Sequence, residues 1–388
     1  MADPQRSGIA RVAVVGAGAF GRNHLRVYRA LAGSAVLVAC VDPSPSAREA
    51  VAREYSIPAF DSVAALLASG IAVDAASVCT PTVQHASVAL SLLRAGIDVL
   101  IEKPIAASLE EADTILAEAA AHGCIVQVGH LERFNPAVTA ALPLRNRPMF
   151  FESHRLSVFT PRSLDVDVVL DLMIHDLDVV LTLAASPVRE VRAVGLPVLS
   201  QKTDIANVRI EFESGAVANF TASRVSTERV RKLRFFQPHQ YLSLDFARQD
   251  VLMIDVTAAA SLSPAQMQAL FSGAGLKVAS ESHTAEEVEA HLESLRAGGQ
   301  IAGDLAARSG LPAEGGAQAH PSQGLSLRKV PTEPGEPLRL EIEHFLHAVR
   351  TRETPRVSGQ DGRAALALAL EINQAIAHHA ERAGLTHP

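Results

Sequence analysis

The stretch RVAVVGAGAFG, residues 11–21, decides the fold of this chain. Residues 11–15 have the composition of a strand that is buried on both faces. Gly16, Gly18 and Gly21 follow as a G-x-G-x-x-G motif where a helix is predicted to begin. The first glycine permits a tight turn, the second lets the backbone approach a pyrophosphate, and the third allows close packing of the helix on the strand. The motif predicts a dinucleotide site with the following contacts: Gly16, Gly18, Ala19, Phe20 and Gly21.

Asp42 follows the second predicted strand, residues 36–41, and stands 21 residues after Gly21. A carboxylate at that place accepts hydrogen bonds from the diol of an adenine ribose and repels a 2′-phosphate. The cofactor is therefore expected to be NAD and not NADP. The alternative, a glycine turn that binds no nucleotide, is disfavoured because strand, helix and acid are all in place.

The first third of the chain alternates between apolar strands and amphipathic helices. Further strands are predicted at 75–79, 99–102 and 125–128, and helices at 19–32, 84–94 and 108–121. Strands separated by helices make βαβ units, which build a parallel sheet that is covered on both faces. We expect a doubly wound α/β domain over residues 1–130.

From about residue 147 predicted strands follow one another with few helices between them. The predicted strands are 149–159, 188–198, 203–213, 216–225, 229–236 and 240–246, and the predicted helices are 166–183, 338–351 and 361–383. This order indicates an α+β domain over residues 131–388 with a large mixed or antiparallel sheet. Residues 297–330, rich in Ala, Gly and Ser and free of aromatic residues, are predicted to be a flexible insertion.

Composition excludes several classes of protein. The 388 residues are 48% hydrophobic and 20% charged with a mean hydropathy of +0.17, which is typical of a globular protein. A net charge of −7 has the wrong sign for a duplex nucleic-acid binder, and no apolar stretch reaches the length of a membrane span. The three cysteines are far apart, so we expect no metal site, no disulfide framework and a reducing, cytoplasmic location.

Lys103 lies in the motif Glu102-Lys103-Pro104 at the carboxyl end of a predicted strand. Open α/β sheets bind their ligands at that edge. A lysine there can donate a hydrogen bond to a hydroxyl or carbonyl oxygen near a nicotinamide, and the proline fixes the turn that carries it. The alternative, an ordinary solvated lysine, stays open at this point.

Asp171 and His175 stand at positions i and i+4 of a predicted helix. Such residues share one face of a helix and can form a carboxylate–imidazole pair. An imidazole has an ordinary pKa near 6.5, which suits removal of a hydroxyl proton. An exposed ion pair on the helix surface is the alternative, and a metal site is disfavoured because no third ligand follows at a motif spacing.

Five stretches together resemble the Gfo/Idh/MocA family of oxidoreductases. They are GAGAFG at 16–21, CTPTVQH at 79–85, EKP at 102–104, GHLERFNP at 129–136 and DLMIHD at 171–176. The resemblance covers residues 11 to about 250 and the last 50, and implies a Rossmann domain joined to an α+β substrate domain. It also implies that Lys103, Asp171 and His175 surround the nicotinamide, with the histidine as acid or base. The cofactor contacts that it adds are Thr80, Pro81, His85, Glu102 and Lys103.

Within this family the chain is most similar to the branch that oxidises C3 of UDP-N-acetylglucosamine for lipid A or surface sugars. A diphosphate substrate needs cations, and paired guanidinium groups hold a diphosphate well. The expected substrate contacts are Arg133, Asn135, Arg155, Arg162, Arg224 and Arg231. The resemblance also implies an aminotransferase that acts next and a homodimer or homotetramer formed through an open sheet face.

Three other functions stay open from the sequence. The first is an inositol or free-sugar dehydrogenase of the same family, and the second is a glycosidase-like enzyme that oxidises C3 transiently. The third is a regulator that binds a dinucleotide without chemistry. Joint retention of Lys103, Asp171 and His175 disfavours the regulator, because a sensor needs no proton-handling set.

Overall fold

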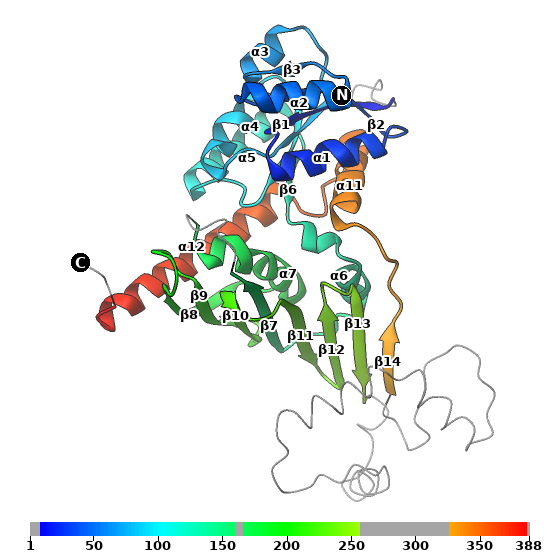
Figure 1. Cartoon of the computed structure of the whole chain (residues 1–388). Coiled ribbons are helices and arrows are strands. Elements are labelled where there is room, and N and C mark those ends of the chain that lie inside the picture. Colours follow the sequence, from blue (N-terminus) through cyan, green and yellow to red (C-terminus); the bar gives the residue numbers. More distant parts are fainter. Residues whose placement is uncertain (1–7, 160–165, 257–325, 386–388) are drawn as a thin grey trace, which may run out of the picture. The chain divides into compact units, whose positions relative to one another are not determined.

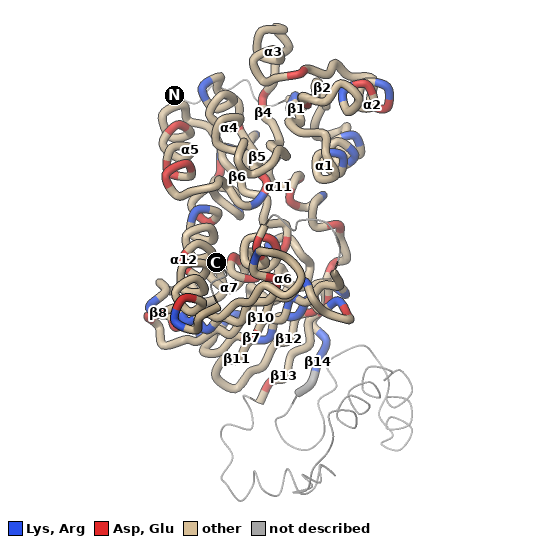
Figure 2. The backbone as a smooth tube through the Cα atoms, turned by 60° about the vertical axis from the view of Figure 1, so that its left-hand side comes forward, with Lys and Arg blue, Asp and Glu red and all other residues tan. Residues whose placement is uncertain are grey.

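A computed structural model describes residues 8–159, 166–256 and 326–385 (Figure 1). Within these ranges no helix is long and apolar enough to cross a membrane. Basic and acidic residues are interleaved along the described chain, with basic residues on the first helix and acidic ones on the fifth (Figure 2). Along the described chain, basic and acidic side chains therefore do not separate into one long basic and one long acidic stretch.

The first sheet has six parallel strands in the order β3-β2-β1-β4-β5-β6. The strands are β1 (Ala10–Val15), β2 (Ala35–Val41), β3 (Ala59–Phe60), β4 (Ala75–Val78), β5 (Asp98–Glu102) and β6 (Val126–Gly129). The helices between them are α1 (Ala19–Ala30), α2 (Pro45–Tyr55), α3 (Val63–Ala68), α4 (His85–Arg94) and α5 (Leu109–His122). The order of the strands reverses between β1 and β4, and dinucleotides bind at such a switch point. The predicted doubly wound sheet is confirmed.

Helix α11 (Pro337–Thr351) comes late in the chain but packs on the first sheet. Its apolar residues Leu338, Ile342, Phe345 and Leu346 recur at helical spacing and join the core formed by the buried residues of β1. The sequence predicts this helix without indicating which sheet it covers. The division of the chain at residue 130 stays a prediction.

The second sheet has eight strands in the order β14-β13-β12-β11-β7-β10-β9-β8. They are β7 (Phe150–Val158), β8 (Val188–Leu196), β9 (Ile205–Phe212), β10 (Val217–Ser226), β11 (Val230–Gln237), β12 (Gln240–Asp245), β13 (Asp250–Asp255) and β14 (Ser326–Val330). β7 pairs parallel with β10 and antiparallel with β11, so the sheet is mixed, as predicted. The two strands that the sequence analysis did not predict, β13 and β14, lie together at one edge.

Helices cover one face of the second sheet (Figure 1). They are α6 (Pro136–Ala141), α7 (Ile174–Ala184) and α12 (Gly359–Arg382). On this inner face Phe151, Ser153 and Arg155 of β7 stand opposite Phe235, Leu233 and Arg231 of β11. All of these side chains except that of Arg231 are buried.

Two predictions about the second domain need correction. Residues 326–330, assigned to the flexible insertion, form β14, and residues 257–325 lie outside the described residues. The single helix predicted over 166–183 begins as a π-helix, Val169–Met173, and continues as α7. A π-helix closes its hydrogen bonds over five residues, and such single turns occur within α-helices.

Candidate active site

The glycine loop after β1 has the geometry that the motif predicts. Gly16 has φ +96°, and a Cβ at this position would lie 2.6 Å from the carbonyl oxygen of Cys79. A Cβ on Gly21 would lie 1.8 Å from the carbonyl oxygen of Gly16. Around Gly18, in contrast, no atom lies within 4 Å of the Cβ position. The loop is therefore closely packed at its two ends and open at its middle glycine, which fits a pyrophosphate at the start of α1.

Asp42 is hydrogen-bonded to the same glycine loop. Its Oδ2 accepts a hydrogen bond from the backbone N–H of Ala17 at 2.7 Å, and its Oδ1 accepts one from Ser44 at 2.8 Å. An ionised carboxylate has about four acceptor positions, so two remain for a ribose diol. Asp42 thus shapes the glycine loop and keeps the capacity to bind the ribose.

Thr80 and His85 follow β4 beside the glycine loop. The buried His85 approaches the carbonyl oxygen of Pro104 with Nδ1 at 2.8 Å and that of Thr80 with Nε2 at 2.9 Å. No ring nitrogen is left for a cofactor, so the expected contact of His85 is corrected to support of the loop. The hydroxyl of Thr80 is buried and has no partner in the described chain, whereas Pro81 is exposed. These two fit a cofactor contact.

Glu102 points into the protein. The buried Glu102 lies 2.8 Å from Nε2 of His24, and Nδ1 of this histidine lies 3.0 Å from the hydroxyl of Ser77. A Cβ on Gly129 would approach the Glu102 carboxylate to 3.0 Å, so glycine is needed there. The expected cofactor contact of Glu102 is thus corrected to an internal bond that anchors the end of β5. The sequence analysis missed His24, whose signal is a polar residue on the apolar face of α1.

Lys103 and Asp171 meet in the structure. The lysine Nζ donates to the backbone carbonyl of Asp171 at 2.7 Å and lies 3.9 Å from its carboxylate. Burial lowers the pKa of Lys103, and the charge of Asp171 opposes this shift. The ammonium is therefore held at the carboxyl edge of the first sheet, next to the π-helix that precedes α7.

His175 stands in the first turn of α7. Its Nδ1 is buried without a hydrogen-bond partner, so Nε2 is the accessible ring nitrogen. Burial lowers the pKa of His175 well below its usual range, and the positive charges of Lys103 and Arg155 add to this effect. The imidazole is neutral at pH 7 and able to accept a proton.

The predicted pair of Asp171 and His175 is not formed. Neither a hydrogen bond nor an ion pair between them occurs among the described residues. The carboxylate of Asp171 lies instead 3.9 Å from Nζ of Lys103. The structure therefore brings both residues to the same region but assigns the carboxylate to the lysine.

Arg155 forms a buried ion triad. Its Nε and Nη2 donate to the carboxylate of Asp176 at 2.8 Å each, and its Nη1 donates to Glu132 at 3.0 Å. The expected substrate contact of Arg155 is thus corrected to an internal role. The sequence signal that was missed is Asp176 itself, an acid within an apolar helix, which is buried only when it is paired.

Other predicted substrate contacts are also internal. Arg133 donates to the carboxylate of Asp178 at 3.1 Å, and Asn135 caps α6 by accepting the N–H of Ala137 at 3.0 Å. Arg224 is buried 3.5 Å from the carboxylate of Asp204. Burial raises the pKa of Asp204, but hydrogen bonds from Ser200, Leu199 and Val198 outweigh it and bring the pKa to about 2. Arg162 lies outside the described residues.

Arg231 is the predicted substrate contact that stays exposed. It stands directly opposite Arg155 on the inner face of the sheet, and no acid pairs with it in the described chain. Its positive charge contributes to the lowered pKa of His175, which places it toward the same region. An unpaired guanidinium near the accessible imidazole is suited to an anionic group of a substrate.

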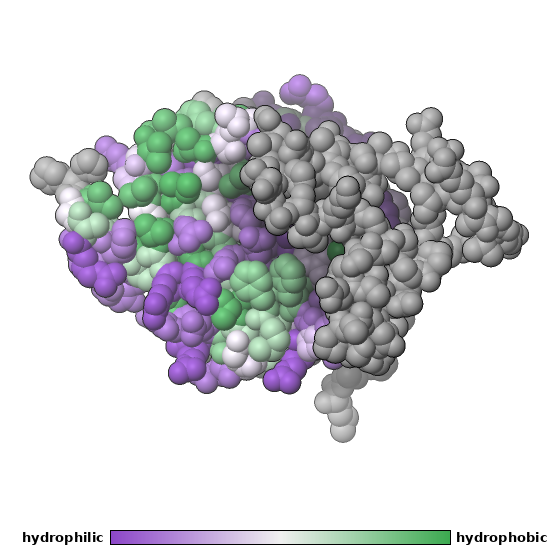
Figure 3. Space-filling view, turned by 90° about the horizontal axis from the view of Figure 1, so that it is seen from below, coloured by the Kyte–Doolittle hydropathy of each residue, from purple (hydrophilic) through white to green (hydrophobic). Residues whose placement is uncertain are grey.

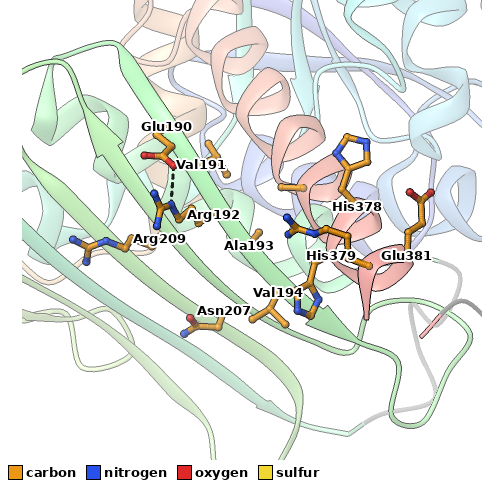
Figure 4. A pocket seen from close by; sticks show the side chains of 12 residues that line it. Glu190, Val191, Arg192, Ala193, Val194, Asn207, Arg209, His378, His379 and Glu381 are labelled. Atoms are coloured by element: carbon orange, nitrogen blue, oxygen red, sulfur yellow. Dashed lines mark hydrogen bonds and ion pairs between the residues drawn. The ribbon is translucent and has the colours of Figure 1, made fainter. Parts of the chain in front are cut away.

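An open hollow of about 990 Å³ lies between the outer strands of the sheet and the end of α12 (Figure 4). Its charged lining comes from Arg192, Arg209, His378, His379 and Glu381 among others, and Arg192 donates to Glu190 at 2.7 Å. It shares no lining residue with the group around Lys103 and His175. The described ranges hold no cluster of three acids, histidines or cysteines placed to bind a metal ion.

A G-x-G-x-x-G loop at the switch point of a doubly wound sheet is typical of dinucleotide-dependent oxidoreductases. Residues 10–130 match the oxidoreductase family with an NAD-binding Rossmann fold, and residues 145–237 match the GFO/IDH/MocA C-terminal domain. The chain belongs to the Gfo/Idh/MocA family.

Two relatives indicate the kind of reaction. UDP-N-acetylglucosamine 3-dehydrogenase from Acidithiobacillus ferrooxidans is 40% identical over 237 residues, which cover 61% of this chain and 74% of that protein. A solved structure of that enzyme superposes with a TM-score of 0.74 at 31% identity, over 95% of this chain and 98% of the other. The scyllo-inositol 2-dehydrogenase (NAD(+)) of Bacillus subtilis is 29% identical over 56% of this chain and 68% of its own length. The chain is thus an NAD-dependent dehydrogenase that acts on CH–OH groups of sugars.

Replacing Arg155 by Met should destabilise the protein strongly. The substitution leaves Glu132 and Asp176 buried without their cation, and breaking a buried ion pair in this way costs about 3–5 kcal/mol. Urea unfolding measures this loss. Arg231→Met is the matched control, because the exposed neighbour should change the free energy of unfolding by less than about 0.5 kcal/mol. Equal losses in the two variants would contradict the assignment.

Replacing Asp42 by Ser should move the cofactor preference toward NADP. The change removes the charge that repels a 2′-phosphate and weakens the hold on the Ala17 N–H, so binding of both cofactors should decline while their ratio shifts. The ratio of kcat/KM for NAD and NADP measures the effect. An unchanged ratio would place the discrimination at another residue.

Proposed function

We propose that this enzyme oxidises the C3 hydroxyl of UDP-N-acetylglucosamine to the 3-keto sugar. The observation that carries the proposal is the unpaired Arg231 on the face where His175 lies, together with 40% identity to a dehydrogenase of that name. A free sugar or an inositol has no anionic group that calls for an exposed guanidinium. A diphosphate binds it through charge-assisted hydrogen bonds.

Each step of the proposed oxidation has a residue that would carry it. Gly18 and the N-terminus of α1 would hold the pyrophosphate of NAD, and Asp42 its ribose. Bound NAD supplies the acceptor for the hydride that leaves the oxidised carbon. Nε2 of His175 accepts the hydroxyl proton, because the ring is neutral at pH 7. The ammonium of Lys103 steadies the negative charge that develops on the oxygen, and Asp171 keeps that ammonium in place.

A second candidate function is oxidation of an inositol or a free sugar. The 29% identity to an inositol dehydrogenase over 68% of that protein favours it. The same lysine and histidine would carry the chemistry, and Arg231 would have no ligand. The two candidates therefore differ at the guanidinium and not at the reacting carbon.

A second enzyme would have to consume the proposed 3-keto product. A 3-keto sugar nucleotide is a substrate for an aminotransferase, so we propose such an enzyme next in a route to lipid A or another surface sugar. The cytoplasmic location expected from the sequence stays a prediction.

Purified enzyme with NAD and UDP-N-acetylglucosamine should form NADH, and the sugar nucleotide should lose the mass of two hydrogens. An aminotransferase with its amino donor, added to consume the ketone, should increase the yield. Lys103→Met and His175→Ala should abolish turnover with little change in NAD affinity, and Arg231→Met should raise KM for the nucleotide sugar with a smaller change in kcat. Reduction of NAD by inositols or free sugars alone would instead support the second candidate.

The outer face of the second sheet is the proposed contact between copies of the chain. Phe150 and Phe236 pair there with ring centroids 5.5 Å apart, and Val158 and Phe236 are each about two-fifths exposed. Seen from below, the described surface carries apolar patches separated by polar side chains (Figure 3). Light scattering should give a dimer or tetramer of the 41.0 kDa chain, and a monomer would contradict this proposal.

A further inference from the structure

A network of four buried polar side chains ends at Glu102, the residue before Lys103. Its members come from three elements: Tyr28 and His24 of α1, Ser77 of β4 and Glu102 of β5. The hydroxyl of Tyr28 lies 2.8 Å from that of Ser77. His24 continues the network, with Nδ1 at 3.0 Å from the Ser77 hydroxyl and Nε2 at 2.8 Å from the Glu102 carboxylate. The proposed oxidation makes no use of this network.

The hydrogens of this network indicate the charge of its imidazole. When His24 is neutral, the hydrogens of the Tyr28 hydroxyl, the Ser77 hydroxyl and Nε2 supply one hydrogen for each of the three contacts. A further hydrogen on Nδ1 would leave one hydroxyl hydrogen of the network without an acceptor, because Tyr28 has no other partner in the described chain. An unsatisfied buried donor is costly. The imidazole is therefore neutral and does not cancel the negative charge of Glu102.

The negative charge of Glu102 stands beside Lys103. A trans peptide joins the two residues, so their Cα atoms are about 3.8 Å apart. Apart from His24, no basic side chain pairs with Glu102 among the described residues. The side chain of Glu102 is 10% exposed, against 30% for Asp171, whose carboxylate lies 3.9 Å from the lysine Nζ. Water therefore screens the charge of Glu102 less than that of Asp171.

The surroundings of Lys103 otherwise favour loss of its proton. Burial lowers the pKa of Lys103, the charges of Asp171 and then Glu102 raise it, and the charge of Arg155 lowers it. Two further titratable groups are influenced by the lysine charge, and burial lowers the pKa of each: His130 and His175. Both rings are neutral at pH 7 and add no negative charge. Of the groups around the lysine, only the two acids therefore hold its proton.

We propose that Glu102, held in place by His24, is a positioning residue whose negative charge keeps the neighbouring Lys103 in its ammonium form. The inference rests on the proposed role of Lys103 at the oxyanion and not on which sugar is oxidised. A charged donor makes the stronger hydrogen bond to an oxygen on which negative charge develops, so a neutral amine at this position would slow the reaction. Glu102 thus acts through Lys103 and touches neither cofactor nor substrate.

The ionisation of Lys103 is open to direct measurement, because the sequence holds only five lysines. They are Lys103, Lys202, Lys232, Lys277 and Lys329. Carbon NMR of the full chain with ¹³C at Cε of lysine therefore gives few signals, and the Lys103→Met variant identifies the signal that belongs to Lys103. A pH titration without cofactor or sugar then gives the midpoint at which Lys103 loses its proton.

Two isosteric variants separate this role from packing. Glu102→Gln keeps the size of the side chain and an acceptor for His24 but removes the charge. The midpoint of Lys103 should fall by about half a pH unit or more, as expected when an opposite charge is removed from near a buried group. Glu341→Gln is the matched control, because Glu341 is a fully buried acid of α11 that is not among the charges acting on Lys103. It should leave the midpoint unchanged.

Kinetics should show the same shift on one limb of the pH profile. In kcat/KM the basic limb reports loss of the Lys103 proton, and the acidic limb reports protonation of His175. Glu102→Gln should move the basic limb to lower pH by the shift that NMR gives and leave the acidic limb in place. A purely structural defect would lower kcat/KM at every pH and move neither limb.

The outcomes distinguish this inference from the proposed substrate. Equal Lys103 midpoints in the wild type and a folded Glu102→Gln would overturn the inference, whatever the activity. If Glu102→Gln does not fold, Glu102→Asp and Glu102→Asn compare a charged and a neutral side chain of one size, and equal midpoints in that pair would overturn it as well. An enzyme that leaves UDP-N-acetylglucosamine unchanged but shows the shift would refute the proposed substrate and leave the role of Glu102 standing.

Discussion

The position of helix α7 depends on buried ion pairs. Arg155 on β7 binds Asp176 on α7 and Glu132 in the segment after β6, so a single guanidinium joins a strand of the second sheet, the helix and a segment that leaves the first sheet. Arg133 adds a second bond to the same helix through Asp178. His175 directly precedes Asp176 in the same helix, so the two ion pairs hold the helix that carries it.

The positive charge available near His175 depends on which of the nearby arginines are already paired with acids. Four predicted arginines can be described, and three of them are bound to buried acids, so only Arg231 offers its charge outward. Burial, and after it the positive charge nearby, lowers the pKa of His175, and the same charge would stabilise an oxyanion. The buried ion pairs therefore stabilise the fold, and they also decide which arginine is left to bind a ligand.

The local parts of the fold could be predicted from the sequence because they depend on short-range rules. The apolar run, the three glycines and Asp42 are neighbours in sequence, and the turn they form leaves few alternatives for the backbone. The contact between Asp171 and Lys103 could not be predicted, since it spans 68 residues of chain. Strand β14 escaped prediction because only pairing within the second sheet makes a strand of residues 326–330.

By itself the sequence determined the doubly wound sheet, the NAD-binding domain and the family, and it predicted Lys103 and His175 as the reacting groups. Only the tertiary structure decided which polar residues face a ligand and which are paired internally. The physical reason is that an arginine or a histidine looks alike in sequence whether it is bound or free. The decision depends on partners brought close by folding, as with Arg155 at Asp176 and Glu102 at His24.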